Sequence, residues 1–366
     1  MAVLYDITLR IFYRYGQAVD LGRHLVRVMP LDIPGKQKLG RRHLAITPGP
    51  ADRVDGTDFF GNHMVEIGFD AVGSEVELLL KARVERRRER RPLDISPSLR
   101  RLDLDIAAMR ELSGRAPHHF LGQSARIGQA PQIIHYAKSL SERGMTALEA
   151  VQNLGEALHR DMNFLPGATD ADTRPEDAFE RREGVCQDYA HIMIAALRGL
   201  GVPAGYVSGF LRTIPPEGQE RLEGSDAMHA WVTAWCGRDL GWVEYDPTNA
   251  MFAAEDHVVV GYGRDYSDIS PIKGVTRSAG MAQTGHSVDV VASDLARPTS
   301  PPRFSDSDGG EGLSQSGQSS EQKSVSHSGM AAAQEMGDSA QQSSSMGGPG
   351  GENPGSHEPG SPLNLP

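Results

Sequence analysis

Cys186 combines a nucleophilic side chain with a position that could activate it. It lies within the sequence Gly-Val-Cys-Gln-Asp-Tyr of residues 184–189. Apolar residues at helical spacing follow it, namely Ala190, Met193, Ile194 and Leu197. At the start of the helix that this pattern predicts, unpaired backbone N–H groups and the positive end of the helix dipole favour thiolate over thiol. The thiolate is the nucleophilic form, so we interpret Cys186 as a candidate nucleophile.

Two residues further along the chain could serve as the partners that a catalytic cysteine requires, a base and a group that orients the base. His229 opens an expected strand, and Asp246 closes the next one. The connection of residues 237–240 predicts a hairpin in which Asp246 lies opposite Trp231. Asp246 is then on the same face as His229, one diagonal step away, at about 7–8 Å between Cα atoms. The spacing therefore permits a triad of Cys186, His229 and Asp246.

Each of these residues also has an ordinary structural explanation. An isolated cysteine is most often a small buried apolar residue, and an isolated histidine is more often a hydrogen-bonded structural residue. Asp246 precedes Pro-Thr-Asn and is a typical turn residue. His191, one turn after Cys186, is interpreted mainly as structural because His229 fits the base role better. The backbone N–H of Cys186 is the expected oxyanion donor, with Gln187 as a second candidate.

Residues 1–91, ahead of these motifs, are expected to form a small antiparallel β domain. Apolar residues alternate along its first strand at Ile7, Leu9, Ile11 and Tyr13. Further candidate strands are residues 25–29, 64–69 and 76–84, and residues 58–62 form a predicted turn. Residues 92–130 are interpreted as a connecting segment with some helix around residues 102–112.

Residues 131–279 are expected to form the core that carries the candidate triad. Within it, Thr146 and Glu149 have the spacing of a capping box, and apolar residues at helical spacing follow. From residue 280 onward serine, glycine, glutamine and proline dominate. Such a composition buries too little apolar surface to offset the entropy of ordering the chain. We therefore predict a disordered tail over residues 280–366.

The composition of the whole chain limits its partners. A formal net charge of -11 over 366 residues disfavours non-specific binding to nucleic acid or to an anionic membrane surface. Neither Cys186 nor Cys236 lies in a Cys/His cluster with zinc spacing, so we expect no metal and no organic cofactor. The N-terminal sequence lacks the pattern of a signal peptide, and no apolar run is long enough to span a bilayer. We therefore expect a cytoplasmic location.

Five ordered motifs resemble those of bacterial transglutaminase-like proteins. They are Arg-Glu-Gly-Val-Cys-Gln-Asp-Tyr-Ala-His at residues 182–191, Gly-Val-Pro-Ala-Gly-Tyr-Val-Ser-Gly-Phe at residues 201–210, His-Ala-Trp-Val at residues 229–232, Gly-Trp-Val-Glu-Tyr-Asp-Pro-Thr-Asn at residues 241–249 and Gly-Arg-Asp-Tyr-Ser-Asp at residues 263–268. The N-terminal run with Asp-Phe-Phe-Gly-Asn at residues 58–62 resembles the β domain that precedes the core in this bacterial branch. One departure is visible, since Gly205 stands where arginine is expected in many relatives.

The resemblance implies an α+β fold, in which a papain-like transglutaminase core follows a small antiparallel β domain and precedes a disordered C-terminal tail. It places Cys186 on a helix that packs against a sheet carrying His229 and Asp246. The implied activity is cysteine-dependent acyl transfer on protein or peptide amides through a thioester. The same triad equally permits a peptidase or amidase that uses water as its sole acceptor. A non-catalytic binding module of the same fold is a further alternative, which an intact triad disfavours.

Overall fold

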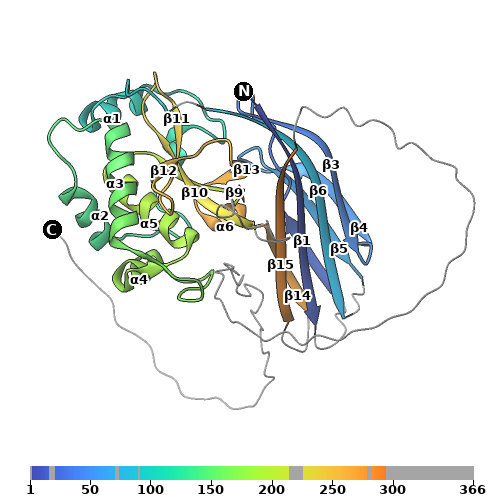
Figure 1. Cartoon of the computed structure of the whole chain (residues 1–366). Helices are drawn as coiled ribbons and strands as arrows, with labels where there is room; N and C mark the ends of the chain where they lie inside the picture. The colour runs from blue at the N-terminus through green and yellow to red at the C-terminus, as the bar shows by residue number, and fades with distance from the viewer. Residues whose placement is uncertain are drawn as a thin grey trace, which may run out of the picture.

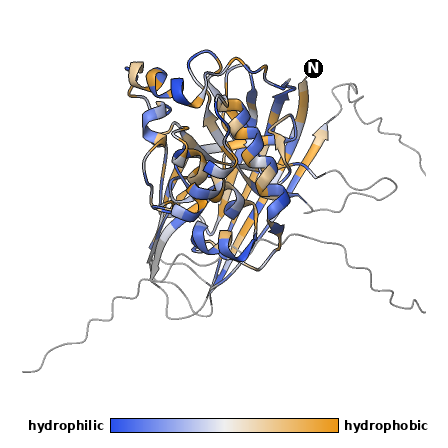
Figure 2. Ribbon diagram, turned by 90° about the vertical axis from the view of Figure 1, so that its left-hand side faces the viewer, coloured by the Kyte–Doolittle hydropathy of each residue, from blue (hydrophilic) through white to orange (hydrophobic). Residues whose placement is uncertain are grey.

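The computed structural model describes residues 2–15, 21–70, 74–89, 91–213, 226–277 and 282–293. Its elements form two parts, a pair of facing sheets and a sheet covered by helices, which lie side by side in Figure 1. Hydrophobic and hydrophilic residues alternate along the long strands and around the helices in Figure 2. In the described part of the chain no helix is long and apolar enough to cross a membrane. The expected cytoplasmic location stays a prediction.

The first part is a sandwich of two four-stranded antiparallel sheets, ordered β15-β1-β6-β3 and β14-β2-β5-β4. The strands are β1 (Ala2–Tyr15), β2 (Leu21–Val26), β3 (Gln37–Thr47), β4 (Asp52–Thr57), β5 (His63–Phe69), β6 (Glu75–Arg87), β14 (Ile272–Arg277) and β15 (Ala282–Ser293). Alternate residues of β1, such as Ile7 and Leu9, point into a core that they share with Ile67 and Phe69 of the opposite sheet. The predicted alternation along β1 is therefore the inner face of the sandwich.

Two outer strands, β3 and β4, were not predicted. Every residue of β4 is exposed, so its sequence carries no apolar alternation that would mark a half-buried strand. It pairs with β5 at the edge of its sheet. In β3 the alternation is interrupted by a register shift between Leu39 and Arg42. Pairing with a neighbouring strand, β6 for β3 and β5 for β4, rather than local pattern, determines both strands.

The C-terminal boundary of the folded part also differs from the prediction. The disordered tail predicted over residues 280–366 is wrong for residues 282–293, which form β15 and pair with β1. Val288 and Val290 are fully buried in the sandwich core, so apolar burial offsets the ordering of this strand. The sandwich is therefore built from both ends of the folded chain. The rest of the predicted tail, residues 294–366, lies outside the described residues.

The second part is a five-stranded antiparallel sheet, ordered β12-β11-β10-β9-β13, with helices packed against it. Its strands are β9 (Ala204–Leu211), β10 (Ala227–Trp235), β11 (Trp242–Asp246), β12 (Met251–Phe252) and β13 (His257–Gly263). The remaining elements are α1 (Leu99–Ala108), η1 (Pro117–Phe120), α2 (Pro131–Ser139), α3 (Ala147–Asp161), β7 (Asn163–Phe164), α4 (Pro175–Arg181), β8 (Glu183–Gly184), α5 (Cys186–Gly199) and α6 (Tyr266–Ile269). The fold class is thus α+β with antiparallel sheets, as predicted.

Helix α5 is the centre of this part. Its residues from Cys186 to Leu197 are all buried, because β10 packs against one side and α2, α3 and α4 pack against the others. The predicted capping box begins α3, where the hydroxyl of Thr146 accepts the Glu149 N–H at 3.1 Å and the Glu149 carboxylate accepts the Thr146 N–H at 2.9 Å. These contacts fix the start of α3, one of the helices that pack against α5.

The sandwich is joined to the five-stranded sheet through β13. The buried side chain of Gln37 donates to the carbonyl of Val259 at 2.8 Å and accepts the N–H of the same residue at 2.8 Å. Asn62, in the predicted turn of residues 58–62, makes the same pair of contacts with Tyr262, at 2.7 and 2.8 Å. Buried hydrogen bonds of this kind are costly to break, so they fix the position of β13 against the sandwich.

Gly205 lies in β9 at a position that has no space for a side chain. A Cβ atom there would come within 2.7 Å of the Gly263 carbonyl oxygen and 2.7 Å of the Phe120 ring. In this chain Phe120 occupies the space that a larger residue would need. The close packing around Gly205 therefore leaves no room for the arginine that is expected at this position.

We predict that Gly205→Ala lowers the free energy of unfolding by about 1–3 kcal/mol, because the backbone and the Phe120 ring must shift to admit one methyl group. Gly56→Ala is the matched control, since Gly56 also lies in a strand but its Cβ would meet nothing within 4 Å. Urea unfolding of both variants and the wild type measures the difference. Equal stability of the two variants would contradict this account.

Candidate active site

Cys186 is the first residue of α5, as predicted, and a buried carboxylate fixes the turn before it. The Val185 N–H donates to Asp188 Oδ2 at 2.8 Å, and the Thr169 hydroxyl donates to the same oxygen at 2.6 Å. A Cβ at Gly184 would come within 2.7 Å of that oxygen, so only glycine fits there without displacing the carboxylate. Burial raises the pKa of Asp188. These contacts hold the N-terminus of α5 and the loop with Thr169 together.

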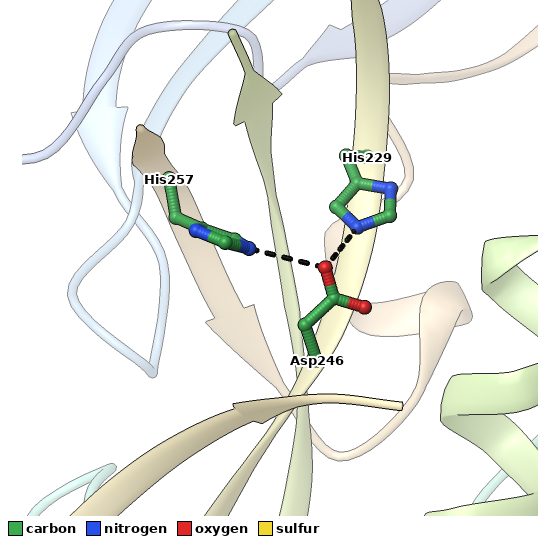
Figure 3. A group of neighbouring side chains, drawn as sticks. All are labelled: His229, Asp246 and His257. Carbon is green, nitrogen blue, oxygen red and sulfur yellow. Dashed lines mark hydrogen bonds and ion pairs between the residues drawn. The ribbon is translucent and has the colours of Figure 1, made fainter. Parts of the chain in front are cut away.

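His229 and Asp246 meet across the predicted hairpin. The register pairs Val232 with Tyr245 and Trp235 with Trp242, and continuing it places Asp246 opposite Trp231. His229 Nε2 lies 2.7 Å from Asp246 Oδ2, and both side chains are buried (Figure 3). The hairpin inferred from the spacing is therefore the one that the chain forms.

Electrostatics favour the protonated imidazole of His229. Burial acts to lower the pKa of His229, but the charge and hydrogen bond of Asp246, together with those of Cys186, outweigh burial and raise the pKa to about 10. For Asp246, burial acts to raise the pKa, and the two histidines that contact it outweigh burial and lower the pKa well below its usual range. An imidazolium between a carboxylate and a thiol is the arrangement that a thiolate nucleophile requires.

Both carboxylate oxygens of Asp246 accept hydrogen bonds from several donors besides His229. Its Oδ1 accepts the backbone N–H groups of Thr248 at 2.9 Å and Asn249 at 3.3 Å. Its Oδ2 accepts the side-chain amide of Asn249 at 2.7 Å and, from the far edge of the sheet, His257 Nε2 at 3.1 Å. The predicted turn after Asp246 is thus part of the site, because its backbone and side chain orient the carboxylate.

His257 was missed by the sequence analysis. It begins β13, which lies on the other side of β9 from the hairpin, so no spacing along the chain links it to Asp246. The ring of Trp231 packs against both histidines, 6.0 Å from His229 and 5.2 Å from His257 between ring centroids, and the two histidine rings are themselves 6.1 Å apart. Gly209 of β9 makes room for that ring, because a Cβ there would lie 2.3 Å from it.

Cys186 and His229 line one narrow cavity. Its other lining residues include Thr169, Tyr206, Ser208, Tyr266 and His286. Its volume of about 50 Å³ is enough for a few water molecules or one slender side chain. His286 belongs to β15, so a strand of the sandwich forms part of the wall of the cavity. The predicted tail segment thereby reaches the candidate site.

Gln187 and His191 are engaged in contacts of their own. The side-chain amide of Gln187 donates to the carbonyl of Ala171 at 3.2 Å and so holds the loop that borders the cavity. Its predicted role as an oxyanion donor stays a prediction. His191 Nε2 accepts the Tyr266 N–H at 3.2 Å, and burial lowers the pKa of His191 to about 4. This contact positions Tyr266 against the cavity, in line with a structural role for His191.

Three possible metal ligands lie together in this site. Atoms of His229, Asp246 and His257 are all within 4.8 Å of one another. Hydrogen bonds account for that proximity, since Asp246 Oδ2 lies 2.7 Å and 3.1 Å from the two imidazole nitrogens. A metal ion would have to displace these contacts and that of the Asn249 amide. The donor set therefore fits a hydrogen-bonded triad better than a metal site.

Cys186 should react with iodoacetamide faster than Cys236 when the native protein is labelled briefly at mildly acidic pH. Cys186 faces the cavity beside His229, whereas Cys236 is 0% exposed and burial raises its pKa to about 12. Peptide mass mapping of the labelled protein measures both sites. Equal labelling of the two cysteines would show that the helix start and the imidazole do not activate Cys186.

Comparison with known proteins adds to this geometry. The sequence profile of the Transglutaminase-like superfamily matches residues 134–247, and that of the Bacterial transglutaminase-like N-terminal region matches residues 5–85. An uncharacterised protein of Mycobacterium tuberculosis is 30% identical over 284 residues, which cover 74% of this chain and 87% of the relative. A protein-glutamine gamma-glutamyltransferase of Pseudomonas aeruginosa is 38% identical over 84 residues, which cover 23% of this chain and 12% of that protein.

A solved structure shares the fold of this chain. It comes from Cytophaga hutchinsonii and carries the name of a candidate cysteine protease. The two structures superpose with a TM-score of 0.63 at 21% sequence identity, over 80% of this chain and 92% of the other. The match spans the sandwich as well as the helical part, so the two parts form a combination that also occurs in another protein.

Proposed function

Since the chain belongs to the transglutaminase-like superfamily, we propose that it is a cysteine-dependent acyl-transfer enzyme that acts on protein or peptide amides. The observation that supports this most is the assembly of Cys186, His229 and Asp246. His229 Nε2 lies 2.7 Å from Asp246 Oδ2, and His229 and Cys186 interact at the cavity that both line. Nucleophile, base and orienting carboxylate are thus in the order that covalent catalysis requires.

In the first half of the proposed reaction, the Cys186 thiolate attacks the carbonyl carbon of an amide and a carbon–sulfur bond forms. The backbone N–H of Cys186 stabilises the oxyanion in this proposal, because it belongs to the first residue of α5, at the positive end of the helix. His229 gives its proton to the leaving nitrogen as the carbon–nitrogen bond breaks. Ammonia or an amine departs and a thioester remains on Cys186.

In the second half, an incoming amine or water attacks the thioester. The His229 imidazole takes a proton from the attacking group, and the thiolate leaves. Asp246 holds the ring in the tautomer with its proton on Nε2 and stabilises the imidazolium. An amine and water would both be activated by His229 and Asp246, so the triad permits transfer to an amine as well as hydrolysis.

An amine acceptor is the outcome that we favour. One relative, matched over 84 residues, is named a protein-glutamine gamma-glutamyltransferase, and this name denotes transfer of an acyl group to an amine. The cavity beside Cys186, with a volume of about 50 Å³, is small enough to favour a small or unbranched group such as the glutamine amide over a bulky one. We therefore propose a glutamine side chain in a protein or peptide as the acyl donor.

Product masses test this proposal. The full-length protein is incubated with glutamine-containing peptides, with and without a primary amine, and the peptides are analysed by mass spectrometry. Incorporation of the amine is the expected result. The small mass increase of deamidation, or shortened peptides, would show instead that water is the acceptor. No change with any peptide, while Cys186 remains reactive, would overturn the proposed function.

A further inference from the structure

We propose that His257 is a positioning residue that holds the Asp246 carboxylate ionised and oriented toward His229. This inference rests on the proposed function, because it concerns the same triad. In Figure 3, His257 and His229 approach Asp246 from different directions, and both rings are directed at the same carboxylate oxygen. The His257 side chain is 1% exposed and is absent from the cavity lining, so it acts through Asp246 rather than on a substrate.

The contacts of His257 determine which ring nitrogen carries the proton. Its Nδ1 accepts the backbone N–H of Ala254 at 3.3 Å, which only an unprotonated nitrogen can do. The proton therefore resides on Nε2, which lies 3.1 Å from Asp246 Oδ2 and donates to it. A nitrogen that carries a proton cannot bind a metal ion, so this tautomer makes His257 a hydrogen-bond donor and not a ligand.

Both ends of His257 are fixed by the fold. Its backbone N–H donates to the Ala254 carbonyl at 3.1 Å. Its own carbonyl accepts Nε of Arg86 at 2.7 Å, and Arg86 is a fully buried residue of β6 in the sandwich. An imidazole held this firmly loses little further entropy when it donates to Asp246. The N-terminal sandwich thereby contributes to the triad, through Arg86 and His257.

The charged neighbours of the triad define what removal of His257 should do. The main titratable groups that act on Asp246 are His229 and His257, and those that act on His229 are Asp246 and Cys186. Tyr245, the preceding residue of β11, also feels the charge of Asp246. Without the donor on His257, the carboxylate takes up a proton at a higher pH. A protonated Asp246 no longer supports the His229 imidazolium, so Cys186 should stay unreactive up to a higher pH.

Two substitutions separate the contacts of His257. His257→Asn keeps an acceptor near the Nδ1 position, for the Ala254 N–H, but removes the donor to Asp246. His257→Gln keeps an N–H donor near the Nε2 position and removes the acceptor for Ala254. Both are smaller than or similar to histidine and uncharged. If His257 were purely structural, both substitutions would disturb the site. In the proposed role, His257→Asn disturbs Asp246, whereas His257→Gln preserves the hydrogen bond to it.

The pH dependence of Cys186 alkylation by iodoacetamide is the primary measurement, because it needs no substrate. We expect the acid limb of the profile to shift upward by about one pH unit in His257→Asn and to return toward the wild-type position in His257→Gln. With a peptide substrate, kcat should fall by about 10-fold in the first variant while KM stays unchanged. Identical alkylation profiles in all three proteins would overturn the inference.

The tautomer of His257 can also be measured directly in the wild-type protein. Nuclear magnetic resonance of protein labelled with ¹⁵N-histidine reports the tautomer of each ring, and His257→Gln identifies the signal. We expect the proton of His257 on Nε2, and a proton on Nδ1 alone would overturn the inference. If the wild type shows the expected tautomer and the variants show the expected alkylation profiles, but the wild type transfers no acyl group, the proposed function is refuted and the role of His257 stays supported.

Discussion

Cys186→Ala is expected to lower the rate of acyl transfer by about 10⁵-fold or more, because no other group can form the thioester. Cys186 is the only one of the two cysteines that faces the cavity with His229. The substitution removes one sulfur atom at the start of α5 and leaves the Asp188 contacts of that turn intact. Steady-state rates with a glutamine peptide and an amine, measured beside the circular dichroism spectrum, test this expectation.

Cys236→Ala is the control for loss of a thiol as such. Cys236 is buried in the core that includes Leu102 and Val243, so its substitution should lower stability while activity is largely retained. Trapping also distinguishes the two positions, since incubation with substrate followed by acid quenching should yield an acyl adduct on Cys186 alone. An active Cys186→Ala protein would refute covalent catalysis by this residue.

His229→Ala is expected to reduce activity nearly as strongly, by about 10⁴-fold or more, because the thiolate loses its ion-pair partner and the leaving group loses its proton donor. The pKa of His229 is raised from 6.5 to about 10 by Asp246 and Cys186 against the opposing effect of burial. The imidazolium is therefore present at neutral pH and is lost as the pH rises through about 10. The wild-type rate should fall on that alkaline side.

His191→Ala is the matched control, since His191 is also a buried histidine of the core but contacts Tyr266 instead of Asp246. Its loss should act mainly on stability through the cavity that the ring leaves. The double variant Cys186→Ala with His229→Ala should be little worse than Cys186→Ala, because residues that act as one unit are not additive. An active His229→Ala enzyme beside an inactive, folded His191→Ala enzyme would move the base to His191.

The sequence by itself determined those parts of the site that depend on local periodicity. An apolar pattern of helical period from Ala190 onward predicts a helix that starts near Cys186, and α5 begins at that residue. The length of one hairpin connection permits the pairing of His229 with Asp246, since a strand alternates its faces at every residue, and the chain forms this pair. The capping box of α3 is likewise a contact between near neighbours in the chain.

Only the tertiary structure decided what depends on strands far apart in the sequence. β15 belongs to the sandwich because it pairs with β1, more than 260 residues earlier, and its own composition could not show that partner. Gly205 is explained by Phe120 and by Gly263, neither of which is its neighbour in the chain. His257 reaches Asp246 only because Arg86 and Gln37 of the sandwich fix β13 at the edge of the sheet. Such contacts close long loops, and no local pattern encodes which distant segment satisfies them.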